Sequence, residues 1–371
     1  MSDFLLIGGG VIGLLTAREL RLAGAEVVVL ERGEPARESS WAGGGIVSPL
    51  YPWRYAEPVT ALAAASQARY PSLCAELRAA TGIDPELERS GLLIESPGEE
   101  AVAARWAAAR GVRLEAVARE EIAELEPGLA APPAGALWLP DVAHVRNPRF
   151  TKALRADVVA RGVRLLAGHA VSGFDIAPGH GSGRIAAVLT PHGRHAAEIY
   201  IVCAGAWTGD LLGPLGPRPP IDPVKGQMLL FRARPGIVRT THLAQDRYAI
   251  PRRDGRVLFG STLEHSGYDK ATTGAAHEEL WRIATSRFPA LAGFEVERHW
   301  AGLRPGSPSG IPFIGRHPAF ANLFVNAGHY RNGIVLGPAS AALLADLALG
   351  REPSLDPAPY AISAALSGVH S

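Results

Sequence analysis

The sequence predicts an α/β protein made of a Rossmann-like domain and a second, α+β domain built on a mixed, largely antiparallel sheet. Three observations support this fold class. Residues 1–31 follow the order strand, glycine turn, helix, strand, which is typical of a parallel pair. After the proline- and glycine-rich stretch Gly213–Pro223, which its composition predicts to be a linker, short apolar runs separated by turns indicate antiparallel strands. A length of 371 residues fits two domains at roughly 150 residues each.

The first unit of the chain is defined by its apolar pattern. Phe4–Ile7 predicts a buried strand, Val11–Ala23 predicts an amphipathic helix that ends at Gly24, and Glu26–Leu30 predicts a second buried strand. A strand, helix and strand in this order form a parallel pair with the helix as the crossover.

Gly8, Gly10 and Gly13 lie between that first strand and that helix, where dinucleotide-binding proteins carry the same glycine spacing. Gly8 permits the turn, Gly10 lets the backbone approach a pyrophosphate, and Gly13 lets helix and strand pack closely. The helix N-terminus adds free N–H groups and a partial positive charge. Glu31 comes 18 residues after Gly13, at the end of the second strand, where it can bind ribose hydroxyls. Together these residues predict a dinucleotide site.

The middle of the chain alternates helical and turn-rich stretches. Ala56–Ala80 is an alanine-rich helical region that we expect to break near Pro71. Residues 99–125 predict a helix, a short strand and a helix, and Pro127–Pro140 predicts a loop. Asn147–Arg161 predicts a further helix that begins at an asparagine cap.

The later elements follow from the same signals. Helices are expected at Ala275–Arg287 and Ile334–Leu349, and Gly350 closes the second of them. Strands are expected at Glu198–Cys203, Met228–Arg232, Tyr248–Pro251, Arg256–Gly260, Phe294–Gly302 and Leu323–Asn326. The chain therefore returns to its first domain at the C-terminus.

Composition and charge exclude several classes of protein. Apolar residues make up 47% and charged residues 20%, and the net charge of +1 gives no basic stripe for a nucleic acid. Cys74 and Cys203 have no metal or redox spacing and are expected to be buried free thiols. The apolar run Phe4–Ala17 lacks a basic leader and is too short for a bilayer. We expect a cytoplasmic protein with no metal site and no transmembrane segment.

A second cluster, Ser39–Ile46 (SSWAGGGI), follows Glu31 closely. Its hydroxyls can bind phosphate or ribitol, and its glycines let the backbone pass against a flat ring. With this cluster the chain resembles the FAD-dependent amine oxidases of the D-amino-acid oxidase and sarcosine oxidase superfamily, nearest to glycine oxidase of the thiamine-pathway type. Four further segments match that family: PVKGQ at 223–227, YAIPR at 248–252, WAGLRPG at 300–306 and GHYRNGI at 328–334.

The resemblance implies a glutathione-reductase-type FAD-binding domain. Because no cysteine lies near the WAGLRPG segment, where covalent relatives attach the flavin, the FAD is expected to be noncovalent. A helix start near the flavin, at the GHYRNGI segment, would stabilise negative charge on the reduced ring. The expected FAD contacts are Gly8, Gly10, Val11, Ile12, Gly13, Glu31, Arg32, Ser39, Ser40, Gly44, Gly45, Ile46, Val171, Ala204, Gly205, His329, Tyr330, Arg331, Asn332, Gly333, Ile334 and Val335.

The resemblance also implies the substrate site. Arg304 and Arg331 are expected to hold the substrate carboxylate, because a guanidinium offers a planar fork of donors, and Tyr248 is expected to assist them. The chain has many arginines, so a structural role for each is the alternative. Hydride transfer from the substrate Cα to flavin N5 would give an imine, which hydrolyses, and oxygen would take the electrons to form peroxide.

The substrate expected is glycine, with sarcosine, small D-amino acids and a cyclic imino acid left open. Ile46 and Leu263 stand where glycine oxidases often have methionine, which alters the shape of an apolar site. Tyr51, Trp53 and Tyr55 either line the entrance or pack between the domains. One alternative function is a dehydrogenase that passes electrons to a quinone or protein acceptor, and a second is a non-catalytic flavin-binding subunit.

The expected domains are discontinuous. The FAD-binding domain comprises residues 1–78, 145–222 and 302–365, and the substrate-binding domain comprises residues 79–144 and 223–301. The expected partners are a small amino acid or amine and oxygen or another electron acceptor, with a homo-oligomer left open. The family also includes an enzyme that modifies tRNA. This alternative is disfavoured, because the sequence shows neither a methyltransferase region nor a basic face.

Overall fold

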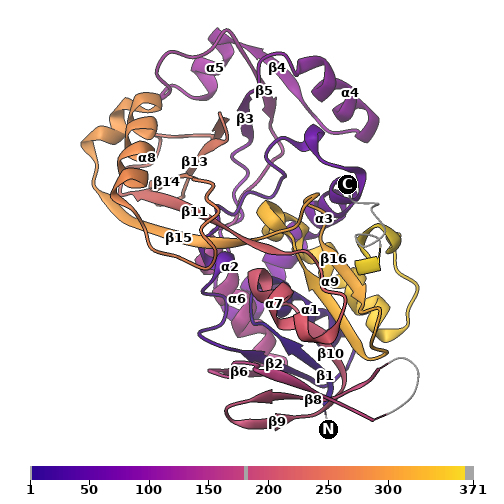
Figure 1. Cartoon of the computed structure of the whole chain (residues 1–371). Helices are drawn as coiled ribbons and strands as arrows, with labels where there is room; N and C mark the ends of the chain where they lie inside the picture. Colours follow the sequence, from indigo (N-terminus) through magenta and orange to yellow (C-terminus); the bar gives the residue numbers. More distant parts are fainter. Residues whose placement is uncertain (1, 179–182, 364–371) are drawn as a thin grey trace.

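A computed structural model describes residues 2–178 and 183–363, so residue 1, residues 179–182 and residues 364–365 of the expected domains lie outside it. The described residues form two large sheets, one in the lower half of Figure 1 and one in the upper half, joined by long strands and loops. The predicted α/β class, with one mostly parallel sheet and one largely antiparallel sheet, is confirmed.

The six-stranded sheet has the order β16-β17-β10-β1-β2-β6. All neighbours in it are parallel except β16 and β17. The apolar runs that predict buried strands are buried on both faces, as a covered parallel sheet requires. Its strands are β1 (Ser2–Ile7), β2 (Val27–Glu31), β6 (Arg164–Ala167), β10 (Ala197–Val202), β16 (Phe313–Arg316) and β17 (Leu323–Ala327).

Helices cover one face of this sheet, and a small three-stranded sheet with a short helix, α7, covers the other. The covering helices are α1 (Val11–Leu22), α3 (Glu57–Thr81), α6 (Asn147–Ala160) and α9 (Gly333–Leu349). On the opposite face lie α7 (Thr208–Leu212), β7 (Gly173–Ile176), β8 (Ile185–Thr190) and β9 (Gly193–His195).

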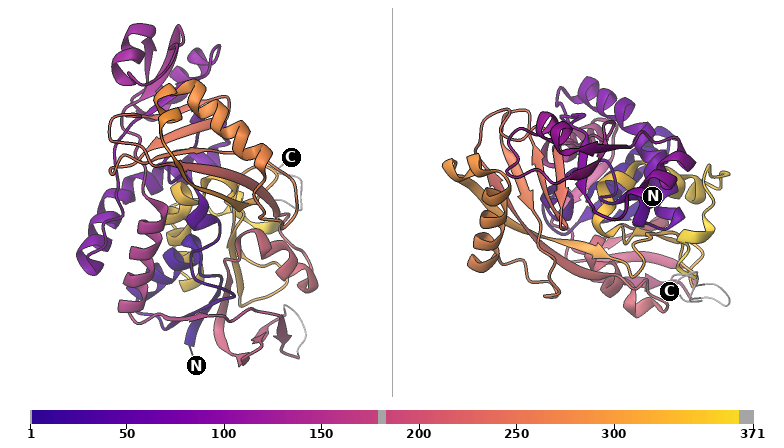
Figure 2. Two further views of the ribbon diagram at one scale, coloured as in Figure 1. Left: turned by 90° about the vertical axis from the view of Figure 1, so that its left-hand side faces the viewer. Right: turned by 90° about the horizontal axis from the view of Figure 1, so that it is seen from above.

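The eight-stranded sheet has the order β15-β11-β14-β13-β12-β3-β5-β4. Only the pairing of β12 with β3 is parallel among the described strands of this sheet. One face packs on α5 and α8, and the other faces the part of the molecule that contains the six-stranded sheet (Figure 2). Its strands are β3 (Leu92–Glu95), β4 (Glu115–Ala118), β5 (Gly135–Leu139), β11 (Asp222–Phe231), β12 (Thr241–Ala244), β13 (Arg247–Pro251), β14 (Val257–Gly260) and β15 (Val296–Gly306).

Several expected elements differ from the structure. The helical region 56–80 does not break at Pro71: α3 continues to Thr81 because a proline removes only one backbone donor and the helix buries Tyr70 and Leu77. The expected loop Pro127–Pro140 contains β5, whose apolar residues pair with β3 and β4. The helix expected from Asn147 has Arg146 at its cap position instead. The remaining helices are α2 (Ser39–Ala42), α4 (Glu100–Arg110), α5 (Arg119–Leu125) and α8 (Gly274–Arg287).

Within the described residues, one segment is long and apolar enough to cross a bilayer by length and composition, whereas the sequence analysis expected no such stretch. It is Tyr330–Leu349, mostly α9. In the fold α9 is a core helix that packs against α1 and α3, and two thirds of its apolar window is buried. Cys74 and Cys203 are buried and free, as expected.

Candidate active site

A cavity of about 490 Å³ lies between the two halves of the molecule. Residues at the carboxyl ends of β1, β10 and β17 line one side, and residues of β11, β13 and β15 line the other. Ligands of parallel sheets bind at the carboxyl ends of the strands, so this position is the one that the dinucleotide motif predicts.

The glycine turn places the start of α1 at the cavity wall. Gly8 has a positive φ of 110°, and a Cβ at Gly13 would lie 2.0 Å from the Gly8 carbonyl oxygen. Gly13 is therefore a packing glycine and does not line the cavity. The Val11 backbone N–H donates a 2.8 Å hydrogen bond to Ser40 Oγ, which joins the helix start to the second glycine cluster.

Glu31 ends β2 at the same wall. Its Oε2 accepts a 2.8 Å hydrogen bond from the Gly9 N–H, and its Oε1 accepts a 3.0 Å hydrogen bond from the Gly33 N–H. The two bonds hold the carboxylate in place, and each oxygen keeps a lone pair for a ribose hydroxyl.

The glycine loop Gly43–Gly45 is held by an arginine from the opposite half. Arg252 Nη2 donates to the Gly44 carbonyl oxygen at 2.7 Å, and its Nη1 donates to the Val145 carbonyl oxygen at 3.0 Å. Arg252 is 8% exposed and makes no ion pair within the described residues, and its burial lowers its pKa to about 10. A cation buried in this way fixes the loop through directed bonds to carbonyl oxygens.

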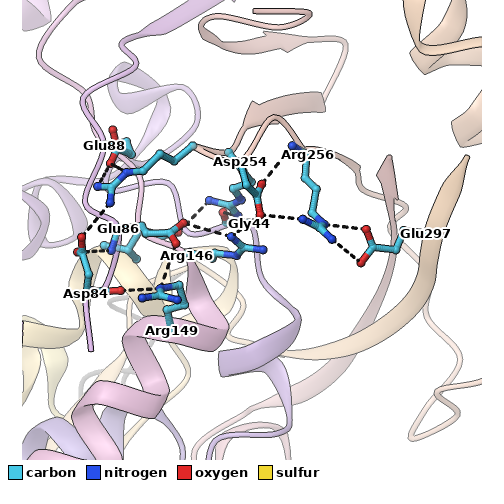
Figure 3. A network of polar contacts seen from close by, with 12 residues as sticks. Gly44, Asp84, Glu86, Glu88, Arg146, Arg149, Asp254, Arg256 and Glu297 are labelled. Carbon is cyan, nitrogen blue, oxygen red and sulfur yellow. Dashed lines mark hydrogen bonds and ion pairs between the residues drawn. The ribbon is translucent and has the colours of Figure 1, made fainter. Parts of the chain in front are cut away.

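An ion-pair network surrounds this junction (Figure 3). Arg146 bridges Glu86 and Asp254, and Arg256 continues the chain from Asp254 to Glu297. These residues come from the segment before β3, the start of α6 and the β13–β14–β15 region. The network therefore ties the two halves together beside the glycine loop.

Arg304 lies at one end of the cavity, on β15. Its Nη1 donates to the Lys225 carbonyl oxygen at 3.2 Å, and its Nη2 donates to Ser261 Oγ at 2.6 Å and to the Thr262 carbonyl oxygen at 3.3 Å. A Cβ at Gly226 would lie 2.1 Å from Nη2, so the guanidinium rests on a residue without a side chain. Burial lowers the pKa of Arg304. 

Tyr248 and Arg331 line the same end. The Tyr248 hydroxyl lies 3.3 Å from Ser261 Oγ and 3.9 Å from Met228 Sδ. Arg331 is half-buried and makes no hydrogen bond or ion pair with any residue in the described part of the chain. A guanidinium on a cavity wall without an acceptor is suited to an anionic ligand.

The start of α9 forms the wall next to Arg331. Gly333 and Ile334 line the cavity, while Asn332 and Val335 are buried behind it and do not. His329 is 1% exposed, and its burial lowers its pKa to about 3. Ser340 Oγ donates to Asn326 Oδ1 at 2.7 Å, so the His329 Nε2–H donates to Ser340 Oγ at 2.7 Å. His329 is thus a neutral support for the segment that carries Arg331.

The structure brings most of the expected site residues to one cavity. Gly13, Asn332 and Val335 are the expected contacts that do not line it. The expected residues that do line it are Gly8, Gly10, Val11, Ile12, Glu31, Arg32, Ser39, Ser40, Gly44, Gly45, Ile46, Val171, Ala204, Gly205, His329, Tyr330, Arg331, Gly333, Ile334, Tyr248 and Arg304.

The aromatic residues that follow the glycine loop do not line the cavity. Tyr51 and Trp53 are buried in the core under the eight-stranded sheet, which is the packing alternative. Leu263 is 48% exposed and does not line the cavity, so it does not shape the site as a methionine there would.

Sequence reasoning missed other wall residues. Leu50 and Met228 supply apolar surface, and Trp207, Asp210 and His169 line the end near β6 and β10. Nothing in the sequence pattern pointed to Trp207. Its role depends on a contact with Arg32, whose Cζ lies 3.5 Å from the Trp207 ring centroid although the two residues are far apart in sequence.

The cavity fits an FAD-type dinucleotide. At Gly10 no side chain covers the start of α1, and a Cβ there would lie 3.2 Å from Ser40 Oγ. The wall also offers the Glu31 carboxylate and the bare backbone of Gly43–Gly45. These are the donors, acceptor and open backbone that a pyrophosphate, a ribose and a flat ring need.

Comparisons with known proteins agree with this site. The chain is 50% identical to glycine oxidases of Pseudomonas aeruginosa and Pseudomonas putida, over 96% and 97% of this chain and 97% and 98% of theirs. The crystal structure of glycine oxidase from Geobacillus kaustophilus matches with a TM-score of 0.90 and 31% identity, over 97% of this chain and 98% of that one.

A family model described as FAD dependent oxidoreductase matches residues 3–347. That span includes both large sheets, except Ser2 of β1, and every residue of the cavity wall. The cofactor is therefore FAD, and the chain belongs to the FAD dependent oxidoreductase family.

Proposed function

We propose that this protein is a glycine oxidase, an FAD-dependent enzyme that deaminates glycine and related small amines with oxygen as the acceptor. The observation that carries the proposal is the pair of arginines at one end of the cavity: Arg331 has no acceptor in the described residues, and the half-buried Arg304 has no carboxylate partner among them. Two cations on one wall of a cofactor cavity match the carboxylate of an amino acid.

The residues that would hold FAD are those of the cavity wall away from the arginines. The start of α1 and Ser40 would take the pyrophosphate, Glu31 a ribose, and the Gly43–Gly45 loop and the start of α9 the ring. FAD, when bound, supplies the acceptor for the hydride that leaves the substrate Cα.

The protein's part is to bind and orient the substrate. Arg304 and Arg331 hold the carboxylate, and Tyr248 assists them. Fixing the carboxylate leaves the Cα–H with one orientation, which supplies proximity in place of acid–base catalysis. The amine reacts in its neutral form, and the imine product hydrolyses in water to an oxo acid and ammonia.

The apolar walls favour a small substrate. Ile46, Leu50 and Met228 line the cavity near Tyr248, so glycine fits best and sarcosine or a small D-amino acid comes next. We also propose the two discontinuous domains given by residue number above, noncovalent FAD, a cytoplasmic location and a role in thiamine synthesis. The thiamine role rests on the resemblance.

Oxygen uptake by the purified FAD-loaded enzyme tests the proposal. Glycine is expected to drive oxygen consumption with one hydrogen peroxide formed for each oxygen, and Arg304→Ala is expected to abolish it at millimolar glycine. Arg282→Ala, an exposed arginine on α8, is the matched control and should retain full activity. Turnover with a dye acceptor but not with oxygen would instead identify a dehydrogenase. An unchanged rate in Arg304→Ala would refute the carboxylate clamp.

A further inference from the structure

One buried hydroxyl lies between the two side chains that would bind the substrate carboxylate. Ser261 follows β14 directly and is 3% exposed. Its Oγ accepts a 2.6 Å hydrogen bond from Arg304 Nη2, and it lies 3.3 Å from the Tyr248 hydroxyl oxygen. Ser261 itself does not line the cavity. It is therefore placed to act on the substrate only through Arg304 and Tyr248.

Ser261 Oγ is the acceptor for both side chains. A guanidinium only donates, so Ser261 Oγ accepts in its bond with Arg304. The Tyr248 hydroxyl donates to the same Oγ at 3.3 Å. A hydroxyl oxygen has two lone pairs, so one serine can hold both side chains, and both of them line the cavity.

Arg304 keeps donors for a ligand. Of the five N–H groups of a guanidinium, Nη2 uses both of its own on Ser261 and Thr262, and Nη1 uses one on Lys225. The Nε–H and one Nη1–H are not used in these bonds. The backbone of Gly226 supports the guanidinium from one side, since a Cβ there would overlap Nη2.

The neighbouring hydroxyl cannot take over this role. Thr262 Oγ1 accepts a 2.9 Å hydrogen bond from the Gln227 N–H and donates to the Glu264 carboxylate. Both its donor and its acceptor capacity are thus directed away from Arg304. Ser261 is the side-chain hydroxyl that contacts Arg304 among the described residues.

We infer that Ser261 is a positioning residue for substrate binding: it accepts hydrogen bonds from Arg304 and from Tyr248 and so holds in place the two side chains that would meet one carboxylate. The inference rests on the proposed function. It adds that the specificity for a carboxylate depends on a residue that touches neither substrate nor cofactor.

Carboxylate binding to the FAD-loaded enzyme tests it. Acetate is titrated while the visible flavin spectrum is followed, for the wild type, Ser261→Ala, Ser261→Thr and the control Ser307→Ala. Ser307 lies three residues after Arg304, is 6% exposed, and its Oγ has no hydrogen-bond partner in the described residues. It therefore matches Ser261 in size and burial but not in contacts.

We expect Ser261→Ala to weaken acetate binding about tenfold and to raise the KM for glycine by a similar factor, with kcat changed less than about threefold, since a hydrogen bond to a charged group is lost. Ser261→Thr, which restores the hydroxyl, should recover most of the binding, and Ser307→Ala should bind as the wild type does. The flavin spectrum and the FAD content should be the same in all four proteins.

The outcomes separate the two levels of the account. Acetate Kd values within twofold of each other in the wild type and Ser261→Ala would overturn the inference and leave the proposed function standing. Equal losses in Ser261→Ala and Ser261→Thr, with FAD retained, would also overturn it, because the threonine carries the hydroxyl. A wild type that shows no saturable response to acetate and no turnover of glycine would refute the proposed function itself.

Discussion

Arg252 Nη2 donates a 2.7 Å hydrogen bond to the Gly44 carbonyl oxygen, and this contact links β13 of the eight-stranded sheet to the glycine loop on the cavity wall. A Cβ at Gly44 would lie 2.8 Å from Ile250 Cδ1, so the loop and β13 are in direct contact as well. The strand that places Tyr248 on the cavity wall thus also holds the loop that would meet the flavin.

Arg252→Met is therefore expected to weaken FAD binding by about tenfold or more, because it leaves two buried carbonyl oxygens without donors. The measurement is the FAD Kd from quenching of flavin fluorescence. The control is Arg253→Met, since Arg253 is half-exposed and pairs with Asp84 and Glu88 at the surface. Equal Kd values for the two variants would contradict the role of Arg252.

Residues 264–273, between β14 and α8, reach the rim of the cavity. Tyr268 stacks on Trp207 at 5.5 Å between ring centroids and donates a 2.7 Å hydrogen bond to Asp210, and both of these partners line the cavity. We expect Tyr268→Ala to speed the release of FAD about three- to tenfold, through the loss of an aromatic pair and a hydrogen bond.

The release rate is read from the recovery of FAD fluorescence after dilution. Trp281→Ala is the control for removing an exposed aromatic side chain, since Trp281 is 38% exposed on α8 and lies outside the cavity wall. A release rate for Tyr268→Ala that equals that of Trp281→Ala would show that this segment does not retain the cofactor.

Arg331→Met is expected to lower kcat/KM for glycine about 10- to 100-fold, because the substrate carboxylate loses a charge-assisted partner. Arg331→Lys should recover part of this loss, since it keeps the charge but not the planar fork. Because Arg331 has no acceptor in the described residues, neither variant should change the thermal unfolding midpoint much. A large drop in that midpoint with unchanged kcat/KM would mark Arg331 as structural.

His329 predicts acid sensitivity. Burial holds its pKa at about 3, against 6.5 for an unperturbed histidine, so between these values the unfolded state binds the proton and the folded state does not. Stability from this residue is therefore full above about pH 6.5 and is lost as the pH falls toward 3. Linkage gives a loss of about 2 kcal/mol between pH 7 and pH 5.

The measurement is the free energy of unfolding in urea at pH 7 and pH 5. His329→Gln should reduce the loss between the two pH values by about 2 kcal/mol relative to the wild type. His265→Gln, at an exposed histidine, should leave the loss unchanged. If both variants lose the same free energy as the wild type, His329 does not contribute to acid sensitivity.

Local pattern predicted the parts of the fold that local physics determines. The β1–α1–β2 unit and the α8 and α9 helices follow from apolar periodicity and glycine caps, and their limits agree with the structure to within one or two residues. The helix break predicted near Pro71 is absent, because the burial of α3 in the core outweighs one missing backbone hydrogen bond. The β5 strand was missed because its partners, β3 and β4, are distant in sequence.

The candidate site divides in the same way. Arg304, Arg331 and Tyr248 could be predicted, because each lies within a short sequence segment that matches the family. Ser261 and Trp207 lie outside the motifs that were recognised, and their contacts with Arg304 and Arg32 exist only after folding. A role that depends on a contact across tens of residues leaves no periodic or compositional signal.

The most direct test of the central claim is the visible absorbance of the purified protein before and after glycine is added without oxygen. The account predicts a flavin spectrum that bleaches with glycine and returns when oxygen is admitted. A flavin spectrum that glycine leaves unchanged would contradict glycine oxidation while keeping the fold and the cofactor. A colourless protein that FAD cannot reconstitute would contradict the account of the cavity.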